Sequence, residues 1–149
     1  MDPLRALASL QRFGIKPGLA TIGRMTASMG DPASSFPSII VAGTNGKGSV
    51  VAMTDAALRA AGYRVGRYTS PHLRTLPERF VVNGTPITEQ DLGHEAAEVQ
   101  ERVDALVADG TLAQPATFFE ATTAIALSWF RRRAVDVALL EVGLGGRFD

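Results

Sequence analysis

The spacing of apolar residues in the first half of the chain predicts alternating helices and strands. Two stripes with helical spacing predict short helices over residues 3–13 and 19–29, each followed by a glycine. Short β-branched runs predict strands at residues 38–41 and 64–69, and residues 50–61 between them have helical composition. This strand, helix, strand order with a tight first turn predicts a parallel sheet.

The second half of the chain continues the alternation. Residues 76–84 predict a short edge strand or hairpin that ends at an Asn-Gly turn. A helix with one apolar face is predicted from the capping residue Thr88 to about residue 109, and a strongly apolar helix over residues 117–133. The near-continuous apolar run at residues 136–141 is typical of a central parallel strand. We therefore expect an α/β fold with a mostly parallel sheet and flanking helices.

Composition restricts the class of protein and its partners. The 149 residues, 46% of them apolar, suit a single domain with a sizeable core. Fifteen basic residues balance fifteen acidic ones, so no overall field attracts nucleic acid or an anionic membrane. The absence of cysteine excludes a disulfide framework and a thiolate metal site. Because there is no signal-peptide pattern and no apolar stretch of membrane-spanning length, we expect a cytoplasmic protein.

A glycine-rich turn at residues 43–49 lies between the first predicted strand and the helix that follows it. Glycines allow several backbone N–H groups to point at one phosphate group, and the helix adds the positive end of its dipole. Lys47 supplies a full positive charge, and the hydroxyl of Ser49 or Thr44 could ligate a magnesium ion that bridges the phosphates. The turn therefore predicts a nucleotide-phosphate site.

The turn departs from the common pattern G-x-x-x-x-G-K-[ST]. Val41 stands in place of the first glycine, and Gly48 separates Lys47 from Ser49. The alternative interpretation is a tight turn with a solvated lysine. Because the chain has only two lysines among its fifteen basic residues, a lysine in this turn favours phosphate binding.

Polar residues also follow the other two predicted parallel strands. Ser70 and His72 come directly after residues 64–69, and Glu141 ends the strand at residues 136–141. Ligands of open α/β sheets bind at the carboxyl ends of the strands, and magnesium prefers hard oxygen ligands such as a carboxylate. Glu141 is therefore a predicted magnesium ligand, whereas Ser70 and His72 are either site residues or ordinary turn residues.

Two other groups of charged residues have more than one interpretation. Glu120 stands beside Phe118 and Phe119 at a predicted helix start. It could cap that helix, or hold a polar group of a ring that stacks on one of the phenylalanines. We interpret Glu78 and Arg79 as a surface pair.

Five segments together resemble the dihydrofolate synthase/folylpolyglutamate synthase family of the Mur ligase superfamily. These segments are residues 43–49, 69–73, 78–84, 117–120 and 141–149. The resemblance runs from about residue 15 to the end, and the additional glycine at position 48 is typical of the family. It implies a P-loop NTPase-like fold of the Mur ligase central-domain type. It also implies an ATP-dependent amide ligase that joins L-glutamate to dihydropteroate or to a folate.

The resemblance implies roles for single residues, with ATP and magnesium as cofactors. The ATP phosphates would be held by Thr44, Asn45, Gly46, Lys47, Gly48 and Ser49. Magnesium would be ligated by Ser49, Ser70 and Glu141. The substrate would contact Pro17, Gly18, Thr117, Phe118, Phe119, Glu120, Phe148 and Asp149, although residues 16–19 depart from the family pattern. The expected catalytic residues are Lys47, Glu141 and His72, the last in the substrate-side loop.

The implied reaction starts when the substrate carboxylate attacks the γ-phosphorus of ATP and forms an acyl phosphate. The amine of glutamate then displaces phosphate, and Lys47 and magnesium stabilise the developing charge. Because the chain ends within a family motif, we expect residues 1–149 to be the amino-terminal portion of the ATP-binding domain. The carboxyl-terminal glutamate-ligase domain would be absent, the chain alone would have little ligase activity, and the full-length protein would be a monomer.

Two other functions stay open. A stand-alone P-loop module or ATPase would hydrolyse ATP without folate or glutamate. A peptidoglycan-precursor ligase of the same superfamily is disfavoured by residues 69–73 and 118–120.

Overall fold

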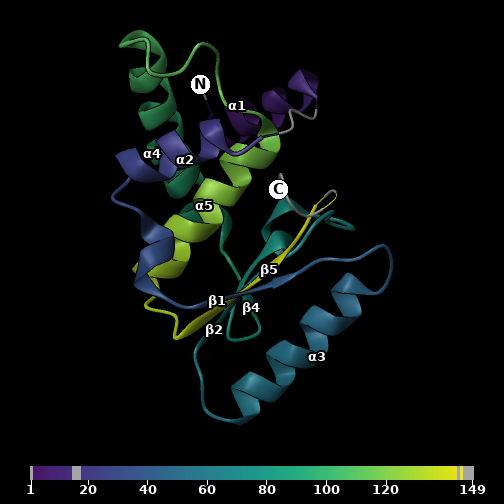
Figure 1. Cartoon of the computed structure of the whole chain (residues 1–149). Coiled ribbons are helices and arrows are strands. Elements are labelled where there is room, and N and C mark those ends of the chain that lie inside the picture. Colours follow the sequence, from purple (N-terminus) through teal and green to yellow (C-terminus); the bar gives the residue numbers. More distant parts are fainter. Residues whose placement is uncertain (1, 15–17, 144, 146–149) are drawn as a thin grey trace.

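A computed structural model describes residues 2–14, 18–143 and 145. The helices are α1 (Pro3–Ser9), α2 (Ala20–Ser28), α3 (Lys47–Ala60), α4 (Glu89–Ala108) and α5 (Phe118–Arg132), with short 3-10 helices at Leu10–Phe13, Pro32–Ser35 and Leu76–Arg79. The strands are β1 (Ser38–Val41), β2 (Val65–Tyr68), β3 (Phe80–Val82), β4 (Thr85–Pro86) and β5 (Val137–Glu141). The sheet separates α3 from a layer formed by the other helices (Figure 1).

The sheet has the strand order β1-β5-β2-β3-β4. β5 pairs in parallel with both β1 and β2, which confirms the predicted central strand, and β3 and β4 extend the sheet antiparallel. The register places Val41 beside Glu141 and Tyr68 beside Leu140, so β1, β5 and β2 end at the same edge. Within the described ranges β1 has no second neighbour, and the Ile40 side chain is 67% exposed.

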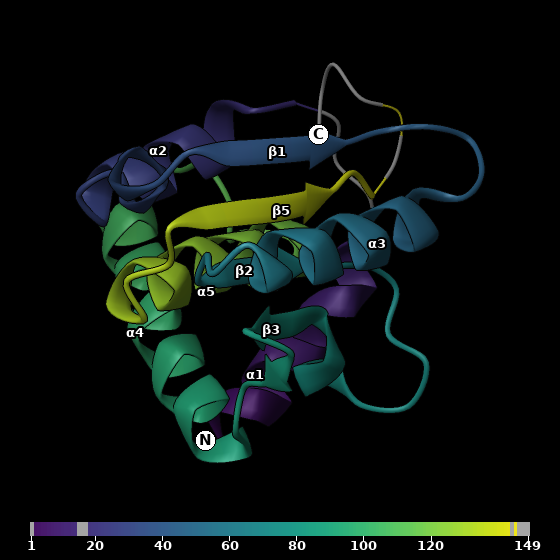
Figure 2. The same cartoon turned by 90° about the horizontal axis from the view of Figure 1, so that it is seen from below.

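Successive residues of β5 pack against opposite helical layers, as the alternation of a strand requires. Val137 and Leu139 form a small apolar cluster with Val51 of α3 and Val65 of β2. Ala138 belongs to the main core on the other face. The view from below shows α3 lying along the sheet (Figure 2). The buried strand is therefore covered on both faces, which is the usual environment of a parallel strand.

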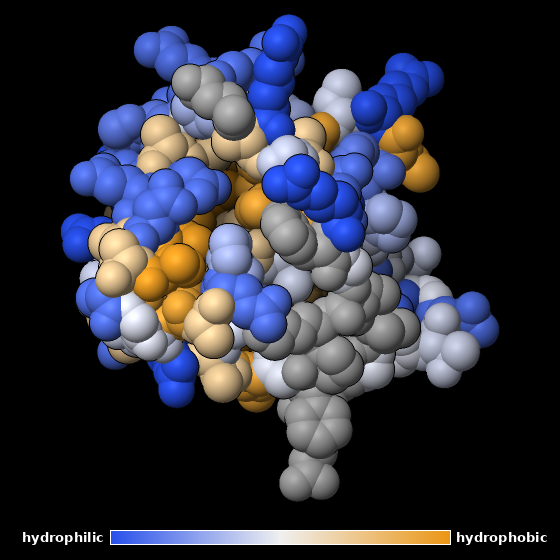
Figure 3. Space-filling model, turned by 90° about the horizontal axis from the view of Figure 1, so that it is seen from above, coloured by the Kyte–Doolittle hydropathy of each residue, from blue (hydrophilic) through white to orange (hydrophobic). Residues whose placement is uncertain are grey.

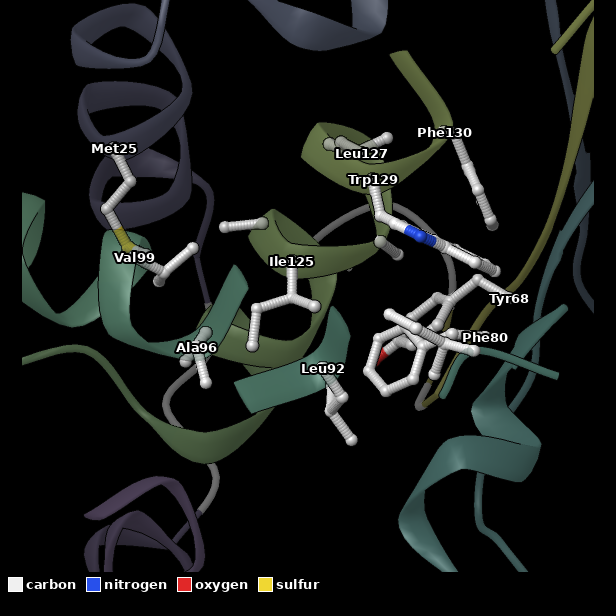
Figure 4. Packing of buried hydrophobic residues seen from close by; sticks show 14 of the residues in the cluster. Met25, Tyr68, Phe80, Leu92, Ala96, Val99, Ile125, Leu127, Trp129 and Phe130 are labelled. Atoms are coloured by element: carbon white, nitrogen blue, oxygen red, sulfur yellow. The ribbon is translucent and has the colours of Figure 1, made fainter. Parts of the chain in front are cut away.

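The main core surrounds α5, which is buried along most of its length (Figure 4). The residues that pack around it include Met25, Tyr68, Phe80, Leu92, Ala96 and Val99. Phe130 lies so close to β2 that a Cβ atom on Gly66 would be 2.9 Å from its ring carbons. The Tyr68 and Thr122 hydroxyls are 2.8 Å apart, and burial raises the pKa of Tyr68. These contacts fix α5 against the strand that leads to Ser70.

Ion pairs connect elements on both sides of the sheet. Arg132 Nε lies 2.8 Å from Oε1 of the buried Glu95, so the end of α5 is tied to α4. Burial raises the pKa of Glu95, and the charge of Arg132 acts in the opposite direction. On the other face, Arg67 Nη1 of β2 lies 3.6 Å from Oδ2 of Asp55, a buried residue of α3. The helix that follows the glycine-rich turn is thus anchored to the sheet.

The predicted helices and strands are present, with shifts at their ends. The largest shifts concern residues 76–79, which form a 3-10 helix before β3 where a strand or hairpin was predicted, and the first helix, whose α-helical part ends at Ser9. α3 begins at Lys47 and not at residue 50, because Gly46 in the left-handed conformation (φ 77°) already ends the turn. Thr88 caps α4 as predicted. The hairpin of β3 and β4 turns at Asn83 and Gly84, with φ values of 49° and 78°.

The outer helical face is mainly polar. In the view from above, hydrophilic side chains surround a group of apolar ones that lies toward the middle of this face (Figure 3). None of the helices in the described part of the chain is both long and apolar enough to cross a membrane.

Candidate active site

The glycine-rich turn connects the end of β1 to the start of α3. Gly43 and Gly46 have φ values of 151° and 77°, which L side chains rarely adopt. The Lys47 ammonium group donates a hydrogen bond to the Gly43 carbonyl at 3.0 Å. This contact folds the side chain back over the turn, so the charge lies where a phosphate group would meet the backbone.

The amino end of α3 is open to an anion. No side chain caps it, and its first turn holds no acidic residue. The first-turn residues Lys47, Gly48 and Ser49 have backbone N–H groups without a partner inside the helix. By contrast, Thr88 and Thr117 cap α4 and α5. A bound phosphate group would supply the acceptors that α3 lacks.

Glu141, the last residue of β5, contacts the segments on both sides. Its Oε2 accepts a hydrogen bond from the Ser70 backbone N–H at 3.1 Å, just beyond β2. Its Oε1 lies 4.0 Å from the Cβ position of Gly48 in the glycine-rich turn. A Cβ atom at position 48 would be in ordinary van der Waals contact with this carboxylate. The structure therefore brings together the three strand ends that the sequence indicated.

The donor atoms at this edge suit a magnesium ion. Ser49 and Ser70 provide hydroxyls and Glu141 a carboxylate, and the contact from Gly48 shows that the turn and the carboxylate are adjacent. Within the described ranges no cluster of three or more His, Cys, Asp or Glu residues could hold a metal. Magnesium needs no such cluster, since it binds through one or two carboxylates and takes further oxygen ligands from phosphates and water.

The start of α5 is fixed by a reciprocal capping box. Glu120 Oε2 accepts hydrogen bonds from the Thr117 N–H at 2.7 Å and the Thr117 hydroxyl at 2.9 Å. The Glu120 N–H donates to the Thr117 hydroxyl oxygen at 3.2 Å. Both residues are buried. The helix-cap interpretation of Glu120 is confirmed.

The two phenylalanines that follow Thr117 are half-buried and contact the site segments. A Cβ atom on Gly143 would lie 2.8 Å from the Phe119 ring, so this ring packs directly on the chain after Glu141. The Phe118 ring lies beneath the guanidinium group of Arg79, 5.2 Å from its centroid. The start of α5 therefore lines the same edge of the sheet.

The interpretation of Glu78 and Arg79 as a surface pair is wrong. Glu78 accepts hydrogen bonds from the backbone N–H groups of Thr75 at 2.8 Å, Leu73 at 3.0 Å and Arg74 at 3.1 Å. These hydrogen bonds lower the pKa of Glu78, and the bond from the Thr75 N–H has the largest effect. Arg79 is buried, with only 8% of the residue exposed. Its Nε donates to His72 Nδ1 at 2.9 Å.

Arg79 is thus a site residue that the sequence did not reveal. The segment Thr75-Leu76-Pro77-Glu78 could have indicated this, because it matches the capping-box pattern. In a capping box the glutamate side chain accepts hydrogen bonds from the backbone at the start of its own helical turn. Glu78 is then not free to pair with Arg79, which directly precedes the apolar run of β3.

Several predicted site residues are not joined to this group. Pro17, Phe148 and Asp149 lie outside the described residues. Gly18 is described, with φ 125°, and a Cβ atom there would meet no described residue within 4 Å. Thr44 and Asn45 are exposed residues of the glycine-rich turn.

A separate pocket of about 300 Å³ lies in the helical layer. It is lined by Met29, Glu98, Glu101, Arg102, Ala105, Ser128, Arg131 and Arg132. It shares no residue with the glycine-rich turn, Ser70 or Glu141, so it is separate from the candidate site at the sheet edge.

Comparisons with known proteins point to one group of relatives. No family model matches the chain. A probable bifunctional folylpolyglutamate synthase/dihydropteroate synthase from Haloferax volcanii is 46% identical over 148 residues, which is 99% of this chain and 17% of the relative. The dihydrofolate synthase/folylpolyglutamate synthase of Bacillus subtilis is 42% identical over 139 residues, or 93% of this chain and 32% of the relative.

Solved structures match the fold as well. Folylpolyglutamate synthase from Thermotoga maritima has a TM-score of 0.89 at 39% identity, covering 99% of this chain and 34% of that one. The Mycobacterium tuberculosis enzyme, solved with ADP and AMPPCP, has a TM-score of 0.87 at 37% identity, with 99% and 34% covered. The chain spans a third or less of the length of these curated relatives. Over nearly all of its own length, the chain is therefore related to the dihydrofolate synthase/folylpolyglutamate synthase family.

Proposed function

We propose that this chain is the amino-terminal, ATP-binding portion of a ligase that adds L-glutamate to dihydropteroate, to folates or to both. The observation that carries the proposal is the meeting of the glycine-rich turn, Ser70 and Glu141 at one sheet edge. The relatives support it. One solved folylpolyglutamate synthase is a complex with AMPPCP and folate, and a solved bifunctional enzyme contains Mn, AMPPNP and L-glutamate. We place this ATP-consuming activity in the cytoplasm.

In this proposal the ATP phosphates bind to the open end of α3. The first-turn N–H groups donate to the phosphate oxygens, and Lys47, held over the turn by the Gly43 carbonyl, adds its charge through its remaining donors. Ser49, Ser70 and Glu141 would hold a magnesium ion, which neutralises phosphate charge when bound. The hydrogen bond from the Ser70 N–H fixes the Glu141 carboxylate in position for this role.

The acceptor substrate would lie on the other side of Glu141, against the start of α5. Phe118 and Phe119 offer aromatic surface there, and the capping box of Thr117 and Glu120 holds that surface rigid. The acceptor carboxylate would attack the γ-phosphorus, ADP would leave, and the amine of glutamate would then displace phosphate from the acyl phosphate. In this proposal glutamate binds to a part of the ligase outside residues 1–149, since this chain matches only 17–32% of the length of these relatives.

The decisive experiment measures phosphate release from ATP. The chain is joined to the remainder of the B. subtilis relative, and dihydropteroate, folate and glutamate are supplied or omitted in turn. A ligase releases phosphate only when an acceptor and glutamate are both present. Release that ignores both substrates would instead support the second candidate, a P-loop ATPase.

The isolated chain tests the phosphate site directly. We expect it to bind AMPPCP and to catalyse no glutamate ligation. Lys47→Ala should weaken AMPPCP binding by about tenfold or more, since a charge-assisted hydrogen bond contributes roughly 1.5–3 kcal/mol. Arg5→Ala is the matched control, because it removes one positive charge from an exposed position on α1. Equal binding by the Lys47 variant and the control would refute the assignment.

A further inference from the structure

Arg79 is a buried cation without an acidic partner. Only 8% of the residue is exposed, and no ion pair among the described residues includes it. Its neighbour in sequence, Glu78, is engaged by three backbone N–H groups. An uncompensated buried charge costs free energy, which makes Arg79 a candidate for a functional role.

Three aromatic or heteroaromatic side chains hold the guanidinium group in place. Its Nε donates to His72 Nδ1 at 2.9 Å, and its carbon lies 5.2 Å from the centre of the Phe118 ring. It also lies near the Tyr68 hydroxyl: burial raises the pKa of Tyr68, and the charge of Arg79 is among the weaker, opposing causes. Since a guanidinium has five N–H donors, its hydrogen bonds to His72 and to the Tyr68 hydroxyl still leave donors on its terminal nitrogens.

The contact with Arg79 also determines what His72 can do. Guanidinium nitrogens only donate, so His72 Nδ1 must accept and carries no hydrogen. The ring hydrogen is therefore on Nε2, which has no hydrogen-bond partner among the described residues. His72 is half-buried and lies two residues beyond Ser70. It presents a donor, and not an acceptor, on its free side.

We propose that Arg79 and His72 form an anion-binding pair that takes the carboxylate of an aromatic acid. Both residues offer N–H donors, and the Phe118 ring stacked against Arg79 provides apolar surface for the aromatic part of such a ligand. Naming the acid as the acceptor, dihydropteroate or a related pteroate, rests on the proposed function. The pair itself rests on the geometry of Arg79, His72 and Phe118 alone.

The pair would act differently from the other candidate catalytic residues. Lys47 and the N–H groups of α3 lie at the end of β1, whereas His72 follows β2 and Arg79 precedes β3. The two anion sites therefore lie on opposite sides of Glu141, which ends the strand between β1 and β2. One would hold the phosphates and the other the carboxylate that reacts with them. His72 then orients the carboxylate by donation and does not remove a proton.

Nitrogen NMR on the isolated chain tests the geometry without any ligand. We expect His72 Nδ1 to give the resonance of an unprotonated ring nitrogen and Nε2 that of a protonated one. The opposite assignment would overturn the proposal whatever the chain binds.

Binding tests the ligand with pteroate, its methyl ester and inorganic phosphate as probes. We expect the ester to bind at least tenfold more weakly than pteroate, because it lacks the charge. Arg79→Lys keeps a positive charge but loses the planar fork. His72→Asn keeps an acceptor for Arg79 but loses the Nε2 donor. Each variant should weaken pteroate binding by about tenfold, or about 1.4 kcal/mol, and leave ester binding unchanged.

Arg64→Lys is the matched control, since Arg64 Nε donates to the Arg133 carbonyl at the opposite end of β2. It should bind pteroate as the unaltered chain does, and thermal melts confirm that all variants fold. The proposal would be overturned if pteroate binding is undetectable or if both site variants bind pteroate as the unaltered chain does. It would also be overturned if these residues bind inorganic phosphate more tightly than pteroate. AMPPCP binding by the same samples separates this result from a failure of the proposed function.

Discussion

Gly66 is the position at which the smallest change should have the clearest effect. It lies in β2 opposite α5, and a Cβ atom there would lie 2.9 Å from two ring carbons of Phe130 and 3.1 Å from a third. Carbon atoms pack best at about 3.5–4.0 Å, so Gly66→Ala requires the strand or the ring to move by roughly half an ångström or more. Phe130 is fully buried, so the ring has no free space into which to turn.

The expected cost is that of an overpacked core. Such insertions destabilise proteins by about 1–3 kcal/mol, and 1 kcal/mol corresponds to roughly 2–4 °C of melting temperature in a domain of this size. We therefore expect Gly66→Ala to lower the melting temperature by roughly 2–12 °C. Urea denaturation gives the free energy of unfolding independently.

Gly93→Ala is the matched control, because it adds the same methyl group. Gly93 lies inside α4, and a Cβ atom there meets nothing within 4 Å. Alanine is favoured over glycine in a helix by about 1 kcal/mol, so this variant should be more stable than the unaltered chain. The loss expected at Gly66 follows from the contact with Phe130, whereas the gain expected at Gly93 follows from helix propensity where the methyl group meets no neighbour. A Gly66→Ala variant as stable as the Gly93→Ala variant would refute this packing argument.

Two other predictions concern polar groups. Thr117→Ala removes the hydroxyl that is hydrogen-bonded to Glu120, and it should lower the free energy of unfolding in urea by about 1 kcal/mol. Thr117→Ser keeps the hydroxyl and should lower it much less. Equal losses of stability would show that the hydroxyl does not stabilise α5. Burial raises the pKa of Glu95 in the folded state above its unfolded value of about 4.5. The contribution of Glu95 to the free energy of unfolding is therefore most favourable below pH 4.5 and is lost as the pH rises through the folded-state pKa. Relative to Glu95→Gln, the unaltered chain should therefore lose stability between pH 4 and pH 7; a gain over that range would mean that Arg132 outweighs burial.

The sequence predicted those parts of the site that depend on strand ends. Ser70, Glu141 and the glycine-rich turn each follow or end an apolar run, and parallel strands deliver their carboxyl ends to one edge. The order of the strands was not readable, yet it decides that Glu141 lies between the other two segments. Arg79 escaped prediction because its burial depends on Phe118 and His72, and adjacent charges of opposite sign suggest a pair when only the chain is in view.

The exposed side of β1 has a practical consequence for any work with the isolated chain. The backbone hydrogen bonds from β1 to β5 involve alternate residues, among them Pro37 and Val41. The N–H and carbonyl groups of Ile40 therefore point away from β5, beside a largely exposed side chain. Such an edge is a template on which another extended segment can add. In concentrated solution that segment will come from neighbouring molecules, and turbidity should grow with time. A charged residue at position 40 should keep the chain dispersed without disturbing the glycine-rich turn that follows.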